Sequence, residues 1–204
     1  MMQAELQKEY FVGLDLGLRR DPSALVVVER IARATGQFDP VLMCHMMERI
    51  YVVRQVRRFP LETPYVEIPL EVARVIKGLD EGVSKTLTVD ATGVGAPVVE
   101  LLKRADFTAR WKPIVITGGE AVGRLPHAET VPRRVLLESL RILLENRSLR
   151  FPKGLANWED LRRELLGLGR EGSRERDDMA FALALACWGQ QPQKQFGFMP
   201  NRLI

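Results

Sequence analysis

Four aspartates stand at places in the sequence where carboxylates can share one site. Asp15 and Asp90 each follow a short apolar or β-branched run, and Asp177 and Asp178 directly precede an apolar run from Met179 to Trp188. This run is rich in Ala and Leu, which favour a helix, and a helix that is apolar on all sides is buried. Two anions at the mouth of a buried helix are costly unless a cation pairs with them. The pattern therefore predicts a bound divalent metal.

The elements before the second aspartate must form a sheet. Apolar and β-branched runs predict strands at residues 10–17, 23–29 and 41–53, with a turn at residues 34–37. Short turns between them favour a three-stranded antiparallel meander. The pattern then changes to alternating helices and strands, which favours parallel strands joined by crossovers. These are a helix at 66–79, a strand at 86–89, a helix at 97–104 and a strand at 113–116.

The rest of the chain is expected to be mostly helical. Residues 117–131 read as a Gly-containing loop and residues 168–175 as a Gly- and Arg-rich loop. Helical spacing of apolar residues predicts further helices, and a short edge strand is expected between two of them. The expected elements are a helix at 132–145, an edge strand at 149–151, a helix at 158–166 and the buried helix after Asp178. The predicted fold class is α/β, with a mixed central sheet flanked by helices.

The chemistry follows from the placement of the acids. Asp15 ends the first strand and Asp90 ends the fourth, and sites in open α/β sheets form at the carboxyl ends of neighbouring strands. Carboxylate oxygens prefer Mg²⁺ or Mn²⁺, and two ions about 4 Å apart activate water and stabilise the leaving oxygen of a phosphodiester. Gly17, Gly93 and Gly95 let backbone approach a phosphate. The plainer interpretation makes each aspartate a helix cap or turn residue.

Three ordered motifs resemble one family. They are Gly13-Leu14-Asp15-Leu16-Gly17, Val89-Asp90-Ala91-Thr92-Gly93-Val94-Gly95 and Arg176-Asp177-Asp178-Met179-Ala180-Phe181-Ala182-Leu183-Ala184. Together they resemble the nuclease domain of the large terminase subunit of tailed bacteriophages, and residues 131–136 resemble the family's segment before the helix that precedes the last motif. The resemblance implies a ribonuclease H-like fold and a two-metal endonuclease that cuts double-stranded DNA with little sequence specificity during viral genome packaging.

The resemblance also implies roles for particular residues. The catalytic residues and metal ligands would be Asp15, Asp90, Asp177 and Asp178, with one or both of the last two binding metal. Ribonuclease H itself carries a further acidic residue on its first helix, which corresponds here to the helix at 66–79. Glu67 and Glu71 lie on that helix, and the choice between them stays open.

The resemblance further implies a part of a larger motor. The sequence contains no G-x-x-x-x-G-K-[ST] phosphate loop, so the family's ATPase half is absent from it and the chain is expected to be an excised C-terminal domain. Residues 10–189 would form the nuclease, residues 1–9 an extension or linker, and residues 190–204 a flexible tail. The implied partners are double-stranded DNA, the terminase ATPase domain, the small terminase subunit and the portal protein.

Composition is compatible with a DNA partner. The chain of 204 residues is 46% hydrophobic and carries a formal net charge of +4, and arginines suit phosphate contacts. We expect DNA contacts from Arg19, Arg20, Arg133, Arg134, Arg174 and Arg176. Arg174 and Arg176 are also expected to hold the acidic pair apart before metal binds. No apolar run reaches transmembrane length, so no membrane partner is expected, and the resemblance implies the host cytoplasm as the setting.

Three other functions compete with this hypothesis. A Holliday-junction resolvase of the same fold would prefer branched DNA to linear duplex. A nucleotide-binding domain of the actin and sugar-kinase type would use the glycines after Asp15 and Asp90 to bind ATP, but that superfamily needs two such lobes. A non-catalytic module that docks on the portal would cleave nothing with any metal.

Overall fold

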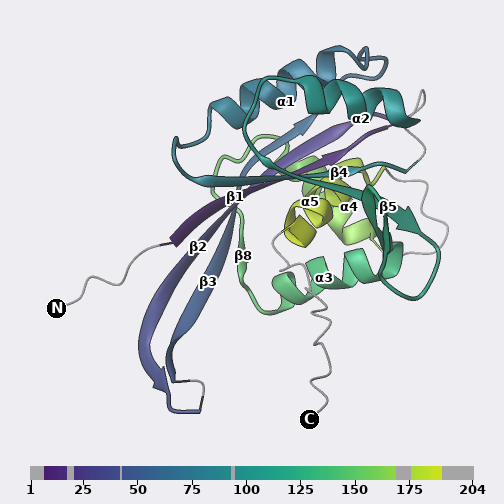
Figure 1. The fold of residues 1–204 in the computed structure, drawn as a ribbon. Coiled ribbons are helices and arrows are strands. Elements are labelled where there is room, and N and C mark those ends of the chain that lie inside the picture. The colour runs from purple at the N-terminus through teal and green to yellow at the C-terminus, as the bar shows by residue number, and fades with distance from the viewer. Residues whose placement is uncertain (1–6, 18–20, 42, 93–94, 169–175, 190–204) are drawn as a thin grey trace, which may run out of the picture.

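The fold is built on one mixed β-sheet of eight strands (Figure 1). The computed structural model describes residues 7–17, 21–41, 43–92, 95–168 and 176–189. The strand order across the sheet is β6-β7-β5-β4-β1-β2-β3-β8. The strands are β1 (Gln7–Asp15), β2 (Ala24–Asp39), β3 (Cys44–Arg58), β4 (Ser84–Asp90), β5 (Arg110–Thr117), β6 (Gly123–Leu125), β7 (Ala128–Pro132) and β8 (Leu149–Arg150).

The two halves of the sheet differ in strand direction. β1, β2 and β3 pair antiparallel, as the meander hypothesis predicted. β1 pairs parallel with β4, β4 with β5, and β5 with β7. β8 is a two-residue strand beside β3 at the sheet edge. The expected α/β fold with a mixed sheet is therefore confirmed, and β1 and β4 are the parallel neighbours that the placement of the acids requires.

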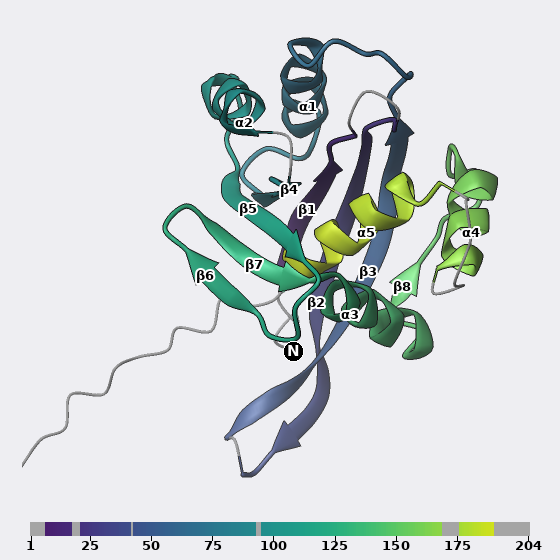
Figure 2. The same ribbon diagram turned by 90° about the vertical axis from the view of Figure 1, so that its right-hand side faces the viewer.

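Helices cover both faces of the sheet. α1 (Glu67–Lys77) and α2 (Gly95–Arg104) lie along one face, and α3 (Arg133–Glu145), α4 (Trp158–Gly167) and α5 (Asp178–Gly189) lie along the other (Figure 1). Figure 2 shows α5 against the sheet, with α3 and α4 beside it. Among the described residues, no helix is both long and apolar enough to cross a membrane.

Helix α5 is the centre of the larger core. Every residue from Asp178 to Trp188 is buried, which agrees with the expectation from its uniformly apolar sequence. The helix approaches β1 at Gly13, where a Cβ atom would lie only 1.9 Å from the carbonyl oxygen of Ala182 and 2.5 Å from the backbone nitrogen of Ala186. Glycine at this position lets the two backbones touch, so the start of α5 comes to rest over the end of β1.

Two sequence predictions of local structure were wrong. The turn expected at residues 34–37 lies inside β2, where the pairing with β3 shifts register between Ala34 and Phe38 and Gly36 has a φ of +80°. The hairpin instead reverses after Asp39, so β2 and β3 extend well beyond the rest of the sheet (Figure 1). The loop expected at residues 117–131 contains the antiparallel pair β6 and β7, because pairing with the edge of β5 supplies hydrogen bonds that the local sequence does not reveal.

Candidate active site

The carboxyl ends of the central strands bring the chemistry-bearing residues to one edge of the sheet. Asp15 is the last residue of β1 and Asp90 the last of β4, and the preceding residues Leu14 and Val89 are partners in the parallel pairing. On the other side, Asp15 is paired with Ala24, and Ala24 with Arg58 at the end of β3. Arg133 directly follows β7. The edge thus places two aspartates between two arginines.

Strand alternation decides which way the two aspartates face. Residues on a strand alternate between the two faces of a sheet. Phe11 belongs to the core cluster around α5, whereas Val12 and Leu14 pack with α1 and α2. Asp15 therefore shares the α5 face with Phe11. In β4 the same rule places Asp90 on the face opposite Leu87 and Val89, which pack with α1 and α2. Both carboxylates face the side of the sheet that α5 covers.

Asp15 lies in an excess of negative charge. Burial raises the pKa of its carboxyl well above the ordinary value. Three nearby carboxylates raise this pKa further, those of Asp90, Asp178 and Asp177, while the charge of Arg133 lowers it. Within the described part of the chain, no hydrogen bond or ion pair reaches the Asp15 carboxylate. Mutual repulsion of this kind marks a place where a cation would be strongly stabilised.

Asp90 is held by the loop that follows its strand. Burial raises the pKa of Asp90, and hydrogen bonds from Thr92 lower it. The Thr92 backbone N–H donates to Asp90 Oδ1 at 2.7 Å, and Thr92 Oγ1 accepts from the Ile116 N–H at 2.6 Å. Thr92 therefore fixes one oxygen of Asp90 against the neighbouring strand β5. The sequence Asp-Ala-Thr thus acts as a turn that orients a carboxylate.

Asp177 forms an exposed ion pair. Arg133 Nη2 donates to Asp177 Oδ2 at 2.6 Å, and the Arg133 guanidinium also lies 4.1 Å from the ring centre of Phe181. The carbonyl oxygen of Asp177 accepts the Phe181 N–H at 2.8 Å, which closes the first turn of α5. Asp177 thus begins the helix with its backbone and holds Arg133 with its side chain.

Asp178 belongs to a buried cluster of charges. Arg58 donates to both oxygens of Asp178, from Nε to Oδ2 at 2.7 Å and from Nη2 to Oδ1 at 3.3 Å. Nη2 also contacts Glu164 Oε1, and Glu164 Oε2 accepts the Ala180 N–H at 2.9 Å. Burial raises the pKa of Glu164 to about 7. One arginine thus links β3, α4 and α5 through two buried carboxylates.

The start of α4 delivers Glu164 to this cluster. Asn157 precedes the helix with a φ of +60°, a left-handed conformation that asparagine tolerates better than most residues. Its Nδ2 donates to the carbonyl oxygen of Val56 at 2.9 Å, two residues before Arg58. Buried Leu161 anchors the same helix one turn before Glu164. The end of β3 and the start of α4 are therefore fixed to each other beside the charged cluster.

Sequence reasoning did not pair Arg58 with the aspartates and did not assign Glu164 to the site. A signal existed for Glu164, since it lies at helical spacing on the stripe that contains Leu161 and Leu168. Glu67 and Glu71, left open as further acidic ligands, lie elsewhere: Glu67 is exposed, and Glu71 pairs with Arg57 at 2.6 Å. Among the described residues, the acid that shares Arg58 with Asp178 is thus Glu164 on α4.

The arginines expected to contact DNA fall into three groups. Arg19, Arg20 and Arg174 lie outside the described residues. Arg133 pairs with Asp177, and Arg134 pairs with Glu120 at 2.8 Å and Glu138 at 2.9 Å. Arg176 is exposed just before α5. Among the described residues, the arginines that contact the acidic pair are Arg133 and Arg58 rather than Arg176.

The three glycines expected near phosphate lie in different places. A Cβ atom at Gly17 would lie 2.0 Å from the Asp21 carbonyl oxygen, so this glycine serves the tight connection between β1 and β2. Gly93 lies outside the described residues, and Gly95 begins α2.

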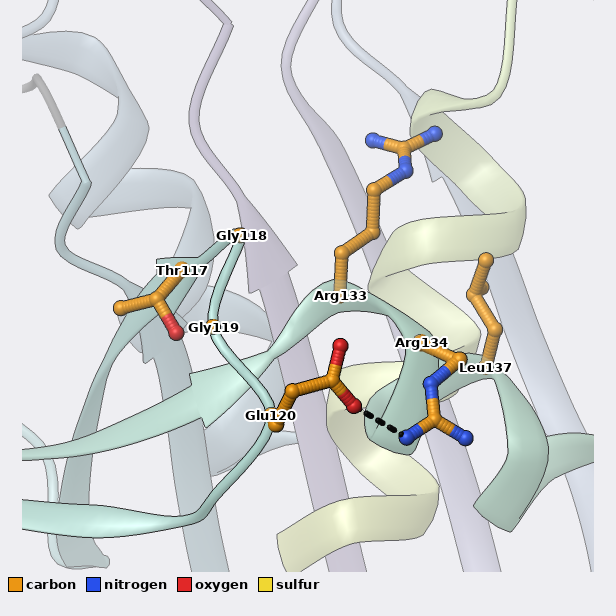
Figure 3. Close-up of a pocket in the computed structure, with 7 residues that line it drawn as sticks. All are labelled: Thr117, Gly118, Gly119, Glu120, Arg133, Arg134 and Leu137. Atoms are coloured by element: carbon orange, nitrogen blue, oxygen red, sulfur yellow. Dashed lines mark hydrogen bonds and ion pairs between the residues drawn. The ribbon is translucent and has the colours of Figure 1, made fainter.

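A pocket of about 380 Å³ opens beside Arg133 (Figure 3). Its lining comes from the segment after β5 and from the start of α3: Thr117, Gly118, Gly119, Glu120, Arg133, Arg134 and Leu137. Figure 3 shows Arg134 facing Glu120, while the Arg133 side chain points away from that pair. The pocket thus combines a glycine-rich backbone with two guanidinium groups, and Arg133 links it to the aspartates through its ion pair with Asp177.

The donor set fits a hard divalent cation in chemistry, because all four aspartates offer carboxylate oxygens. Asp15 and Asp90 also lack an ion-pair partner among the described residues. As the side chains stand, no group of three His, Cys, Asp or Glu residues in the described ranges is arranged to enclose a metal ion. Two of the four carboxylates are occupied instead by Arg58 and Arg133.

Comparison with known proteins supports the fold. No protein-family model and no curated protein sequence matches the chain. The structure is similar to the nuclease domain of g2p, the large terminase of bacteriophage SPP1, solved with bound Mn, with 12% identity, a TM-score of 0.51, and coverage of 87% of this chain and 84% of that one. The chain therefore has the fold of a large-terminase nuclease domain, as its three motifs predicted.

A second solved structure is similar over a smaller part of its length. It is the large terminase of a thermophilic bacteriophage, with 10% identity and a TM-score of 0.48. The match covers 77% of this chain but 31% of that terminase. The chain thus spans about a third of that protein.

Proposed function

We propose that this chain is a metal-dependent endonuclease that hydrolyses phosphodiester bonds of double-stranded DNA during the packaging of a viral genome. The observation that carries the proposal is the convergence of four aspartates at one sheet edge, with Asp15 and Asp90 desolvated and without an ion-pair partner among the described residues. The fold of a large-terminase nuclease domain supports it. That relative was solved with bound Mn, and Mn²⁺ or Mg²⁺ is the cofactor that we propose here.

The aspartates and Thr92 would have different roles in phosphodiester hydrolysis. Bound divalent ions supply a water of lowered pKa and stabilise charge on the phosphate. Asp15 and Asp90 would bind the cation through their carboxylates. The Thr92 N–H would keep one Asp90 oxygen in place. Asp177 and Asp178 place further negative charge across from them, at the start of α5. The described structure offers no basis for strong base preference, so we propose cleavage with little sequence specificity.

DNA would approach over the arginine side of the edge. Arg133 and Arg134 line the pocket beside the aspartates, together with Gly118 and Gly119, whose backbones are open to a close ligand. Guanidinium groups form paired hydrogen bonds with phosphate oxygens. We therefore propose that the DNA backbone runs past this pocket. An ATPase domain, a small terminase subunit and the portal protein are the proposed partners in packaging, with the host cytoplasm as the setting.

A second candidate is a non-catalytic docking module. One observation favours it: no three carboxylates of the described residues are arranged to enclose a metal. This candidate predicts that the protein cleaves no DNA with either metal.

Cleavage of supercoiled plasmid separates these candidates. The wild-type chain should nick and then linearise the plasmid in Mn²⁺ or Mg²⁺ but not in EDTA, and Asp90→Asn should lose detectable cleavage because it removes an anionic ligand. The asparagine retains an oxygen that can accept the Thr92 N–H. Asp106→Asn is the matched control, since Asp106 is an exposed aspartate paired with Lys77 away from the site; it should cleave at the wild-type rate.

The outcomes decide between the functions. Cleavage by Asp90→Asn at the wild-type rate, or no cleavage by a folded wild-type protein with either metal, contradicts the proposed nuclease. A strong preference for four-way junctions over linear duplex would favour the resolvase alternative.

A further inference from the structure

The two arginines at the site hold their aspartates in different ways. Asp177 and Asp178 are adjacent in sequence, yet the first pairs with Arg133 and the second with Arg58. The side chains of Arg133 and Asp177 are 55% and 45% exposed, whereas those of Arg58 and Asp178 are 22% and 7% exposed. Water can therefore replace each partner in the first pair but not in the second.

The Arg133 pair is easily broken. It consists of one contact at 2.6 Å between exposed groups, and exposed ion pairs contribute little because water solvates both partners when they separate. The contact of Arg133 with the Phe181 ring, 4.1 Å from its centre, does not involve Asp177. The guanidinium thus keeps a favourable neighbour when it leaves the carboxylate.

The Arg58 cluster is fixed. Arg58 contacts both oxygens of Asp178 and one oxygen of Glu164, and the other Glu164 oxygen accepts a backbone N–H of α5. Removing the arginine would leave the buried carboxyl groups of Asp178 and Glu164 without a counter-ion, which is strongly unfavourable. This cluster therefore keeps its arrangement whether or not a metal is bound.

We propose that Arg133 is an exchangeable counter-ion, which neutralises Asp177 until a divalent cation binds beside Asp15 and Asp90 and then releases it, while Arg58 stays on Asp178. The proposal rests on the proposed function, since it assumes a cation at this edge. It explains why the described carboxylates do not enclose a metal as they stand. Once released, Arg133 is free to contact a DNA phosphate from the rim of the pocket that it already lines.

Mn²⁺ binding to the full chain without DNA tests the exchange, with free Mn²⁺ measured by electron paramagnetic resonance. Arg133→Ala should bind Mn²⁺ roughly two- to five-fold more tightly than the wild type, the factor that corresponds to losing an exposed competing ion pair. Arg134→Ala is the matched control: it removes the same charge one residue along the helix, but its partners are Glu120 and Glu138. Its Mn²⁺ affinity should equal that of the wild type.

A double-mutant cycle isolates the pair itself. Asp177→Asn should weaken Mn²⁺ binding, and in that background Arg133→Ala should have no further effect because the competing pair is already absent. Arg133→Ala with wild-type or weaker affinity, or an equal gain in Arg134→Ala, overturns the exchange while leaving the nuclease proposal standing. If neither the wild type nor Arg133→Ala binds Mn²⁺, the metal site fails, and the proposed function fails with it.

Discussion

Asp15 and Asp178 lie at the same edge of the sheet, but the protein treats their charges differently. Asp178 is held by a bidentate arginine that also contacts Glu164. Asp15 has no such partner among the described residues, and burial and neighbouring acids raise its pKa. The site therefore has a paired half (Arg58, Glu164 and Asp178) and an open half (Asp15 and Asp90), with Asp177 and Arg133 between them.

The difference between the paired half and the open half shows how a fold can support a cluster of like charges. The paired half satisfies its charges internally, so it can fix α4 and α5 to the end of β3. The open half leaves its charges unsatisfied, and this is the arrangement expected where an external cation contributes the missing charge. We therefore propose that different acids of one cluster serve stability and metal binding. Substitutions in the two halves should then have opposite effects on the stability of the metal-free protein.

The largest effect on stability is expected in the paired half. Arg58→Ala should lower the free energy of unfolding by about 3–5 kcal/mol, because it leaves Asp178 and Glu164 buried without a counter-ion. Urea denaturation measures this loss. Arg141→Ala is the matched control, since it removes an arginine from an exposed pair with Glu145 and should cost at most about 0.5 kcal/mol.

A loss below about 1 kcal/mol in Arg58→Ala would mean that the paired half is not a fixed cluster. The triple variant Arg58→Met, Glu164→Gln and Asp178→Asn removes all three charges together. It should recover much of the lost stability if unpaired charge is the cause of the loss.

A smaller loss is expected where α5 is positioned over both halves. Gly13→Ala should lower the free energy of unfolding by about 1–3 kcal/mol, because the new Cβ overlaps the backbone of α5 and a packed core resists such overfilling. Thermal denaturation checks the effect. Gly118→Ala is the control, since no heavy atom lies within 4 Å of a Cβ there; equal stability of the two variants would contradict the close docking.

A substitution in the open half should raise the stability of the metal-free protein rather than lower it. Asp15→Asn should stabilise the metal-free protein by about 1 kcal/mol at neutral pH, since it removes an unpaired carboxylate. The size of this gain depends on pH. Because the pKa of Asp15 is raised on folding, the protonated carboxyl stabilises the wild type fully below the ordinary carboxyl pKa, and this stability is lost as the pH rises.

The advantage of Asp15→Asn should therefore be larger at about pH 8 than at about pH 5, in EDTA. Melting temperatures at the two pH values measure it. Asp106→Asn, at an exposed aspartate whose pKa Lys77 lowers, should show no gain at either pH. A gain from Asp15→Asn that is larger at low pH would contradict the raised pKa.

The open half could be predicted from sequence, whereas in the paired half only Asp178 could. Asp15 and Asp90 end strands whose apolar residues identify them, and Asp177 and Asp178 open a helix that its composition marks as buried. The element order and mixed sheet followed from the same periodicities. Gly13 is the first residue of the motif that contains Asp15, but the sequence did not predict its contact with α5.

Arg58 and Glu164 meet only through tertiary packing. They lie far apart in the sequence, at the end of β3 and within α4, and their contact depends on the docking of α4 at Asn157. The pair β6–β7 was missed for a similar reason, because its strands are short and are stabilised by the edge of β5. The turn expected at residues 34–37 failed because Gly36 accommodates a register shift within a long strand.

The most direct test of the two halves is a crystal structure of the wild-type chain soaked in Mn²⁺, with anomalous scattering used to place the metal. The account predicts manganese between Asp15 and Asp90, Arg133 displaced from Asp177, and Arg58 still bound to Asp178. Manganese absent from Asp15 and Asp90 in an ordered site, or bound there with Arg58 displaced and Arg133 still on Asp177, would contradict it.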